Sequence, residues 1–398
     1  MVRRRRLVAR SVRFLGVPLL VAAVAAGFAP AGPAVAAQAR AQAPRAFTPY
    51  GGQFNGAAVT SSGDAWAVGL DEGPLSQYWN GKSWTDKSTL GLNAPDGTFY
   101  SVAMTSASNA WAVGFIPGTD SQASLIARWN GKSWKRVSSP NPGPEGTILT
   151  GVAATSATNA WAVGSTAGQK TVIEHWNGKS WARVPSPNPG TYNQVWSVAA
   201  TSASNAWAVG FSDTESVFST LILHWNGKAW SHVASPTPAN GGLGLYGVTA
   251  TSASNAWAVG YTEIGAAGFK TLILHWNGKA WTQVPSPDPV TVTNGGTLTA
   301  NQLQSVAATS ASNAWAVGST QTSLHGSRTM ILHWNGKVWA AVPSPNPYCS
   351  SCDSLYGVAA NSAHNAWAVG TVNVGGLVVI LRWNGTHWVN VESANALV

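Results

Sequence analysis

Small apolar and polar residues alternate in a block that recurs along this chain. The copy at residues 197–210 reads SVAATSASNAWAVG, and a second block follows it, LILHWNGKAWSHV at residues 221–233. Copies of the first block are found at residues 56–69, 101–114, 151–164, 247–260, 305–318 and 357–370. The blocks are short, rich in β-formers and bounded by turn residues, whereas helical periodicity is missing after the N-terminal segment. We therefore expect seven repeats of four strands, numbered 1 to 7.

Three Trp positions recur in every repeat and account for all but one of the 22 tryptophans, leaving Trp196. Side chains alternate across a strand, so Trp207 and Val209 lie on one face of their strand and small residues lie on the other. We expect the large face of each sheet to pack on the small face of the next. The Asn-Gly pair between the third and fourth strands predicts a two-residue type I′ turn, with the flanking Trp residues on one face.

These patterns predict an all-β protein, a closed seven-bladed β-propeller of four-stranded antiparallel blades. An open solenoid of the same units is the alternative. The expected blades span about residues 53–90, 98–140, 148–187, 194–236, 244–287, 302–345 and 354–393 within a propeller at 53–398. The first blade starts on an inner strand and the last ends on an outer strand. Closure would then depend on packing between these blades, without a shared sheet.

The order of a small inner strand, an aromatic-apolar-Gly strand, a third strand and a Trp-bearing outer strand resembles kelch and galactose-oxidase-type propellers. One glycine, as at Gly210, stands where kelch repeats carry two. The resemblance implies a β-propeller fold and gives almost no information on activity. The copper site of galactose oxidases cannot be mapped onto this sequence, whose cysteines both lie in one loop that joins two blades.

The N-terminal 39 residues have the order of a secretory signal peptide, with six early arginines, an apolar run and small residues. A short linker at residues 40–52 follows. Removing those arginines lowers the net charge from +9 to +3, which argues against nucleic-acid binding. We expect a secreted protein without a membrane span in the mature chain, exported by the general secretory route or, alternatively, by the twin-arginine route.

Cys349 and Cys352 lie three positions apart in a Cys-Ser-Ser-Cys loop. In an exported protein we expect them to form a local disulfide. Zinc would need about four ligands, and no further cysteine can complete such a set. We expect no metal and no cofactor.

The spacing within the repeats separates a constant face from a variable face. From the second Trp to the third is five residues in all seven repeats, whereas the span from the third Trp to the next inner-strand Val runs from seventeen to twenty-five. Binding residues are usually carried on such unlike loops. Two residues before the inner-strand Val, the sequence varies and ligand-binding residues are expected at the channel mouth: Asn55, Tyr100, Thr150, Trp196, Tyr246, Gln304 and Tyr356. Alternatively, these side chains cap the core between inner strands.

The favoured function is a secreted non-catalytic binding module for a glycan or an extracellular protein, and we expect a monomer. One alternative is a polysaccharide-active hydrolase or lyase that uses loop carboxylates at the channel mouth. The candidate acids for it are Asp120, Asp213, Glu215, Glu263, Asp288 and Asp353. Another alternative is a structural envelope protein. A histidine precedes the second Trp in four repeats, and we expect these histidines to be hydrogen-bonded structural residues because each belongs to a different blade.

Overall fold

A computed structural model describes residues 52–118, 122–140, 146–215, 217–237, 243–264, 268–289, 299–322, 326–348, 352–372 and 377–394. All of them belong to one compact unit, Phe47–Val398. They form 28 strands and one short 3-10 helix, η1 (Leu90–Leu92). Among these residues no helix is long and apolar enough to cross a membrane.

Each sequence repeat supplies four consecutive strands. Repeats 1 to 3 contain β1 (Gln53–Val59), β2 (Ala65–Leu70), β3 (Pro74–Trp79), β4 (Trp84–Asp86), β5 (Thr98–Ser106), β6 (Asn109–Ile116), β7 (Ala123–Trp129), β8 (Trp134–Arg136), β9 (Thr147–Ser156), β10 (Asn159–Thr166), β11 (Thr171–Trp176) and β12 (Trp181–Arg183). Repeats 4 and 5 contain β13 (Tyr192–Ser202), β14 (Asn205–Thr214), β15 (Val217–Trp225), β16 (Trp230–His232), β17 (Leu243–Ser252), β18 (Asn255–Glu263), β19 (Gly268–Trp276) and β20 (Trp281–Gln283). Repeats 6 and 7 contain β21 (Thr299–Ser310), β22 (Asn313–Thr322), β23 (Ser327–Trp334), β24 (Trp339–Val342), β25 (Asp353–Ser362), β26 (Asn365–Val372), β27 (Val378–Trp383) and β28 (Trp388–Asn390).

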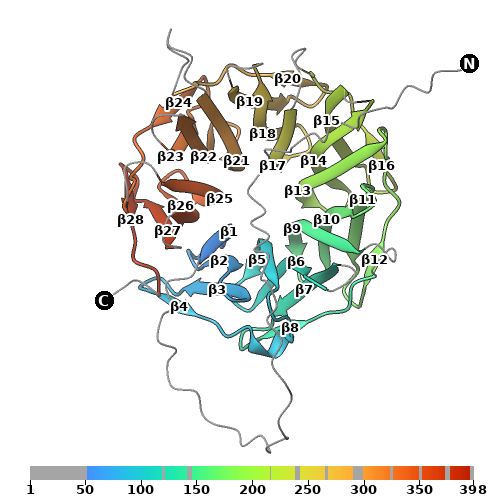
Figure 1. The fold of residues 1–398 in the computed structure, drawn as a ribbon, viewed down its shortest axis with the longest axis vertical. Helices are drawn as coiled ribbons and strands as arrows, with labels where there is room; N and C mark the ends of the chain where they lie inside the picture. The colour runs from blue at the N-terminus through green and yellow to red at the C-terminus, as the bar shows by residue number, and fades with distance from the viewer. Residues whose placement is uncertain are drawn as a thin grey trace, which may run out of the picture. The chain divides into compact units, whose positions relative to one another are not determined.

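Within each repeat the four strands pair in sequence order and antiparallel, as expected. In Figure 1 the first strand of each repeat lies nearest the centre and the fourth lies at the rim. The described strands form six sheets, five of four strands and one of eight. The larger sheet arises because β19 and β21 pair in parallel over two residues, Gly268 with Thr299 and Phe269 with Ala300. The all-β, four-stranded antiparallel architecture is therefore confirmed.

Successive repeats pack large face on small face, which confirms the prediction from alternation. Trp207 and Val209 of β14 are buried in a cluster with the small residues Ala256 and Ala258 of β18 in the next repeat. The other face of β14 packs in turn against repeat 3, where it meets Trp161. Each first Trp contacts the second and third Trp of the following repeat, as Trp207 does with centroid distances of 4.9 and 5.2 Å to Trp276 and Trp281.

The hairpin between the third and fourth strands differs in detail from the prediction. Trp79 pairs with Trp84, so the two rings share a face as expected. The backbone N–H of Asn80 donates to the Ser83 carbonyl at 3.4 Å, which makes Gly81 and Lys82 the central residues of the turn. Gly81 has φ +93°, whereas Lys82, the second central residue, does not have the positive φ that a type I′ turn requires. The type I′ prediction was wrong, because the Asn side chain instead accepts from the Lys82 N–H at 2.9 Å.

Repeats 7 and 1 meet without sharing a sheet. The first strands contact one another in a cycle that runs β1, β5, β9, β13, β17, β21, β25 and back to β1. Phe54, Trp79 and Trp84 of repeat 1 form a buried cluster with Trp367 of repeat 7. Asn361 also donates its side-chain N–H to the Thr60 carbonyl at 2.7 Å. Side-chain packing, supported by hydrogen bonds, therefore joins the two ends of the described repeats.

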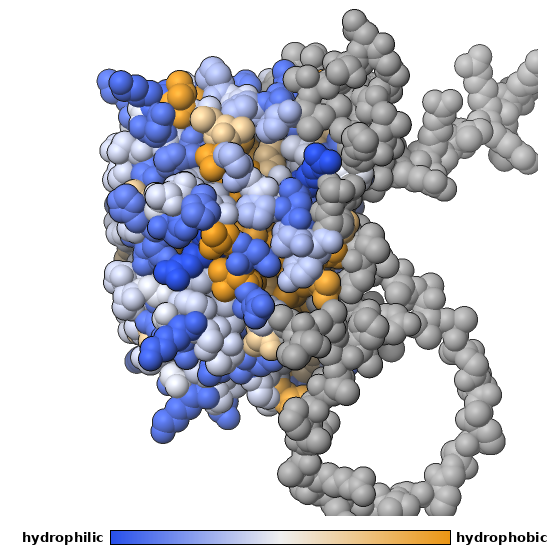
Figure 2. All heavy atoms as spheres, turned by 90° about the vertical axis from the view of Figure 1, so that its left-hand side faces the viewer, coloured by the Kyte–Doolittle hydropathy of each residue, from blue (hydrophilic) through white to orange (hydrophobic). Residues whose placement is uncertain are grey.

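The outer surface near β28 is covered mainly by hydrophilic residues, with apolar residues in small groups between them (Figure 2). The constant turns lie together at one end of the repeats. The second Trp of repeat 2, Trp129 at the end of β7, donates its indole N–H to the carbonyl of Ala107 in the β5–β6 turn at 3.1 Å. The first-to-second and third-to-fourth turns are thus on one face, which confirms that part of the prediction.

Candidate ligand-binding site

The seven variable positions before the inner-strand Val all fall at β-bulges. In repeat 4, Val195 pairs with Gly210 and Ser197 pairs with Val209, so Trp196 has no partner across the ladder. The same irregularity leaves one residue unpaired in the first strand of every other repeat: Asn55, Tyr100, Thr150, Tyr246, Gln304 and Tyr356. All seven side chains are half-buried. Bulges often re-aim a side chain at the edge of a sheet, so these positions are structurally distinct from the strands around them.

Two of these bulge residues hold neighbouring repeats together. Asn55 donates its side-chain N–H to the Phe99 carbonyl of repeat 2 at 2.8 Å. Thr150 donates its hydroxyl to the Val195 carbonyl of repeat 4 at 2.8 Å. The acceptor in both cases is the residue directly before the bulge of the next repeat. Asn55 and Thr150 therefore cap the contact between inner strands, as the alternative interpretation expected.

The other bulge residues are mainly aromatic, and they gather unevenly. Trp196 contacts Tyr246 across the seam between repeats 4 and 5, with ring centroids 5.5 Å apart. Tyr246 stacks on Tyr261 at 5.1 Å, and their hydroxyl oxygens are 2.7 Å apart. Tyr100 stacks on Phe115 in repeat 2 in the same way, at 5.8 Å.

Further aromatic residues extend the group on repeats 4 and 5. Tyr192 stacks on Phe211 at 5.5 Å, and Phe211 contacts Phe218 at 5.8 Å. Phe269 meets Tyr261 edge-on at 5.1 Å. We call the following set the aromatic cluster: Tyr192, Trp196, Phe211, Phe218, Tyr246, Tyr261 and Phe269. Trp196 and Tyr246 were named from the sequence, and the other five were missed.

The missed residues have a sequence signal. Phe211 and Tyr261 directly follow the constant glycine of the second strand, a position where the repeats differ. The residues at this position in the other repeats are Leu70, Phe115, Ser165, Ser319 and Thr371. The second-strand residue lies close to the bulge of the first strand, because Gly210 pairs with Val195. Comparing this position between repeats would have identified both residues.

Several tyrosines at or beside the bulges have a raised pKa. Burial raises the pKa of Tyr100, Tyr261 and Tyr356, and burial together with the Tyr261 hydroxyl raises the pKa of Tyr246 well above its ordinary value. Burial, and to a lesser degree the charge of Asp213, also raises the pKa of Tyr192. Neutral phenols both donate and accept hydrogen bonds, which suits a polar ligand without charge.

The acids expected on the variable face have different roles. Asp288 accepts hydrogen bonds from the Thr271 N–H at 2.8 Å and the Thr271 hydroxyl at 3.1 Å, so it is a structural cap. Asn188 accepts the same bond from Thr171 in repeat 3. Asp353 is fully buried. Asp120 lies outside the described residues.

Asp213 and Glu263 are half-buried on β14 and β18, next to the aromatic cluster. Glu215 is exposed one residue beyond β14, at φ +53°. The structure thus brings Asp213 and Glu263 close to the ligand-binding candidates of repeats 4 and 5. Asp288 instead caps a strand and Asp353 is fully buried.

The repeated histidines are structural residues on the constant face. His224 lies 4.1 Å from the Trp207 ring, and its Nε2 is 2.8 Å from Asn205 Oδ1. The Asn205 amide donates to the Thr201 hydroxyl, so its oxygen must accept and His224 Nε2 must carry the proton. Equivalent His–Asn pairs hold repeats 3, 5 and 6. The hydrogen-bonded structural role is confirmed.

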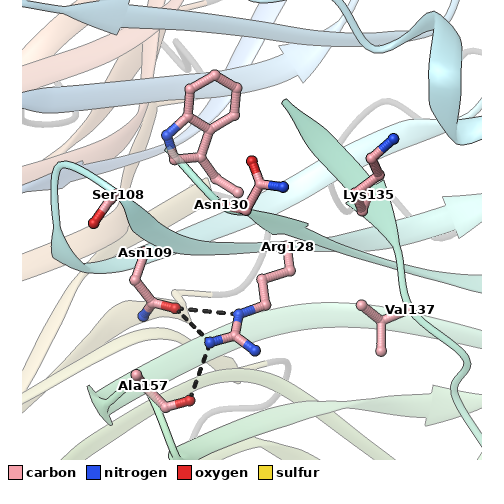
Figure 3. A pocket seen from close by; sticks show the side chains of 8 residues that line it. Ser108, Asn109, Arg128, Asn130, Lys135, Val137 and Ala157 are labelled. Carbon is pink, nitrogen blue, oxygen red and sulfur yellow. Dashed lines mark hydrogen bonds between the residues drawn. The ribbon is translucent and has the colours of Figure 1, made fainter. Parts of the chain in front are cut away.

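A shallow pocket of about 410 Å³ lies on the constant face of repeats 2 and 3 (Figure 3). Arg128 takes the place of the histidine there and donates to Asn109 Oδ1 at 3.0 and 3.2 Å and to the Ala157 carbonyl at 3.4 Å. Its guanidinium also lies over the Trp111 ring at 5.1 Å. These contacts hold the Arg128 guanidinium between repeats 2 and 3. We therefore do not regard the pocket as the ligand site.

Within the described ranges, no three His, Cys, Asp or Glu side chains gather closely enough to hold a metal ion. Cys352 is buried, but Cys349 lies outside the described residues, so the Cys349–Cys352 disulfide stays a prediction. Residues 1–39 also lie outside them.

No protein-family model and no curated protein matches this chain. Solved structures do match. A YCF48 structure from Cyanidioschyzon merolae is 15% identical with a TM-score of 0.54, covering 85% of this chain and 97% of that one. PorZ, an essential bacterial surface component of the type-IX secretion system of Porphyromonas gingivalis, is 12% identical with a TM-score of 0.55, covering 86% of this chain and 48% of that one.

A fungal lectin from Aleuria aurantia, described as a six-bladed β-propeller with a fucose recognition mode, is 14% identical with a TM-score of 0.45. The alignment covers 75% of this chain and 96% of the lectin. The chain has a β-propeller fold. At these identities the likeness concerns the fold alone, and the ligand of this propeller must be argued from its own residues.

Proposed function

We propose that this chain is an exported, non-catalytic, seven-bladed β-propeller that binds a glycan or a protein at the bulges of its inner strands. One observation carries the proposal. After the bulge the inner strands repeat almost letter for letter, yet the unpaired bulge residue changes from Tyr100 to Trp196 to Gln304. Packing alone favours the same residue in every repeat, as at the first Trp. A ligand-binding surface requires different side chains at equivalent positions, and the bulge supplies such a position.

The count of seven blades is supported by the contacts between repeats. Seven sequence repeats each supply four strands, and the first strands contact one another in a closed cycle. The parallel pairing of β19 with β21 is confined to two residue pairs. We therefore treat repeats 5 and 6 as separate blades. The likeness to kelch-type repeats concerns this blade arrangement and supplies no activity.

Export is proposed from residues 1–39, whose charged, apolar and small segments follow the order of a secretory signal. N-terminal sequencing of the protein recovered outside the cell should then find a start close to residue 40. Recovery of the uncleaved chain from the cytoplasm alone would contradict export.

The binding proposal is favoured over the polysaccharide-active enzyme by what surrounds the acids. Hydrolysis needs two carboxylates placed on either side of one glycosidic bond. Asp288 caps a strand and Asp353 is fully buried, which removes two of the candidates.

A glycan array and a pull-down from cell-wall and polysaccharide fractions test the proposal with the mature protein. The variant Trp196→Ala/Tyr246→Ala removes the aromatic bulge pair of repeats 4 and 5. Lys228→Ala/Lys279→Ala changes the same two repeats on the constant face, where both lysines are exposed. We expect the first variant to lose retention and the second to keep it. Retention that survives the first substitution would contradict the bulge site, and release of sugar products by the native protein would favour the enzyme.

A further inference from the structure

Repeats 4 and 5 carry the same three-residue motif beside their aromatic bulges. It reads Phe211-Ser212-Asp213 on β14 and Tyr261-Thr262-Glu263 on β18, an aromatic residue, a hydroxyl residue and an acid. Among the corresponding positions of the other repeats, none combines an aromatic residue with an acid two places later: Leu70 to Glu72, Phe115 to Pro117, Ser165 to Ala167, Ser319 to Gln321 and Thr371 to Asn373. Two adjacent repeats therefore carry an aromatic residue, a hydroxyl residue and an acid at equivalent positions.

Each set joins an aromatic pair to a carboxylate. In repeat 4, Tyr192 stacks on Phe211 with an interplanar angle of 14°. In repeat 5, Tyr246 stacks on Tyr261 at 13°. Asp213 lies directly opposite Tyr192 across the β13–β14 ladder, and Glu263 lies opposite Phe269, which contacts Tyr261, so each acid lies beside its own pair. Trp196 of repeat 4 contacts Tyr246 of the repeat 5 set.

The set of repeat 4 is held in place by the loop before β13. Asn193 is fully buried, and its side chain bonds the backbone N–H of Gly190 at 3.0 Å and the Gly190 carbonyl at 2.7 Å. The Thr191 hydroxyl donates to the Asp213 carbonyl at 2.9 Å, which ties this loop to β14. A rigid support of this kind reduces the ordering that ligand binding must otherwise supply.

The aromatic rings remain accessible, and one carboxylate is incompletely satisfied. Tyr192, Trp196, Phe218 and Tyr246 are all half-buried, whereas Phe211 and Tyr261, on which the two tyrosines stack, are buried. Asp213 Oδ1 is buried and has no hydrogen-bond partner among the described residues, so it is an acceptor that the protein itself leaves unused. Exposed ring area beside a carboxylate acceptor suits a ligand that has an apolar face and hydroxyl donors.

We propose that the seam between repeats 4 and 5 binds two successive sugar units of a neutral oligosaccharide. The proposal rests on the proposed binding function and names the ligand class of the same site. The apolar C–H face of one pyranose would stack on the repeat 4 rings and that of the next on the repeat 5 rings. The hydroxyl groups of the two sugars donate to Asp213 and Glu263. An extended ligand is required because the two sets belong to separate repeats.

Titration calorimetry with the oligosaccharide that binds best on the array, and with its constituent monosaccharide, tests this inference. Asp213→Asn and Glu263→Gln keep the side-chain shape and remove the charged acceptor. Asp288→Asn is the matched control, because Asn188 and Asn346 already occupy the equivalent position in repeats 3 and 6. We expect each of the first two changes to weaken oligosaccharide binding by about tenfold. The control should stay within about twofold, and the monosaccharide should bind far more weakly.

Four outcomes are informative. Saccharide binding that is lost in Trp196→Ala/Tyr246→Ala but unchanged in Asp213→Asn and Glu263→Gln would overturn the two-set site and leave the proposed function intact. The same holds if the protein captures a peptide and no saccharide. Equal affinity for the monosaccharide would overturn the two-sugar arrangement. Binding that none of these substitutions affects would instead refute the bulge site itself.

Discussion

Individual residues that break the repetition show most clearly what the chain adds to its scaffold. Glu174 lies two places before the second Trp of repeat 3, where repeats 4 to 7 have Leu, as at Leu223. It is fully buried and accepts from the Ser139 hydroxyl of repeat 2 at 2.9 and 3.0 Å. Burial raises the pKa of Glu174 to about 7, while the Ser139 hydrogen bond and the charge of Arg183 act in the opposite direction. Its place at a position that is Leu in repeats 4 to 7 was a sequence signal, but its protonation depends on packing against the neighbouring repeat.

Replacing Glu174 should stabilise the protein at alkaline pH. The folded pKa is raised above the unfolded value, so the carboxyl group binds its proton more tightly in the folded state. Its contribution to stability is fully present below the unfolded pKa near 4.5 and is lost as the pH rises through about 7. At pH 8 we expect Glu174→Leu to unfold with a free energy larger by on the order of 3 kcal/mol, and at pH 4.5 the advantage should largely vanish. Urea denaturation at both pH values measures it.

Glu174→Gln serves as the second variant, because Gln77 occupies the same place in repeat 1. It retains a polar partner for Ser139 and removes the titration. Its stability relative to the native protein should rise with pH in the same way. A difference that is the same at both pH values would show that Glu174 is not a buried, titrating acid.

At the scale of strands and turns, much of the architecture follows from the sequence. The alternation of Trp207 and Val209 with small residues predicted which face packs on the next repeat, because strand periodicity fixes the face of each side chain. The bulge at Trp196 was invisible, since one extra residue shifts the register without changing the composition. The turn type was also missed because Asn80 bonds the turn through its side chain. The aromatic cluster depends on packing between repeats, which no single repeat reveals.

The three tryptophans of a repeat should contribute unequally to stability. Trp207 is fully buried between two repeats, whereas Trp225 is half-exposed near the constant face. We expect Trp207→Ala to lower the free energy of unfolding by about 3–5 kcal/mol, and Trp225→Ala by clearly less. Guanidinium denaturation followed by circular dichroism compares them. Equal losses would contradict the assignment of the first Trp as the principal contact between repeats.

At the scale of the whole β-region, the contact between the first and last repeats is the least regular part. The residue after the bulge alternates between Ser and Gly along the chain: Gly56, Ser101, Gly151, Ser197, Gly247, Ser305 and Gly357. Each Ser accepts from the next repeat, as Ser305 does from the Val358 N–H at 3.2 Å. Because the number of repeats is odd, Gly357 meets Gly56, so two glycines lie against each other at this seam. The sequence predicted that the first and last repeats do not share a sheet, as observed, but not this break in the alternation.

A larger side chain at residue 357 should loosen the seam. A Cβ atom there would lie 3.0 Å from the Ala57 N and 3.1 Å from the Asn55 O of repeat 1, and both are backbone atoms. We expect Gly357→Val to lower the melting temperature by several degrees and to speed hydrogen exchange in β1 and β25. Gly357→Ser should do so less, because serine fits this position in three other repeats. Exchange that increases uniformly over all repeats would contradict a local closing seam.

Hydrogen–deuterium exchange, with and without a saturating concentration of the array-selected ligand, shows whether ligand is held at the inner-strand bulges of repeats 4 and 5. We predict slower exchange in the amides around the bulges of β13 and β17, with no change in the constant turns at Gly227 and Gly278. The Trp196→Ala/Tyr246→Ala variant should show no such protection at the same ligand concentration. Protection confined to the constant turns, or unchanged by that substitution, would contradict the claim.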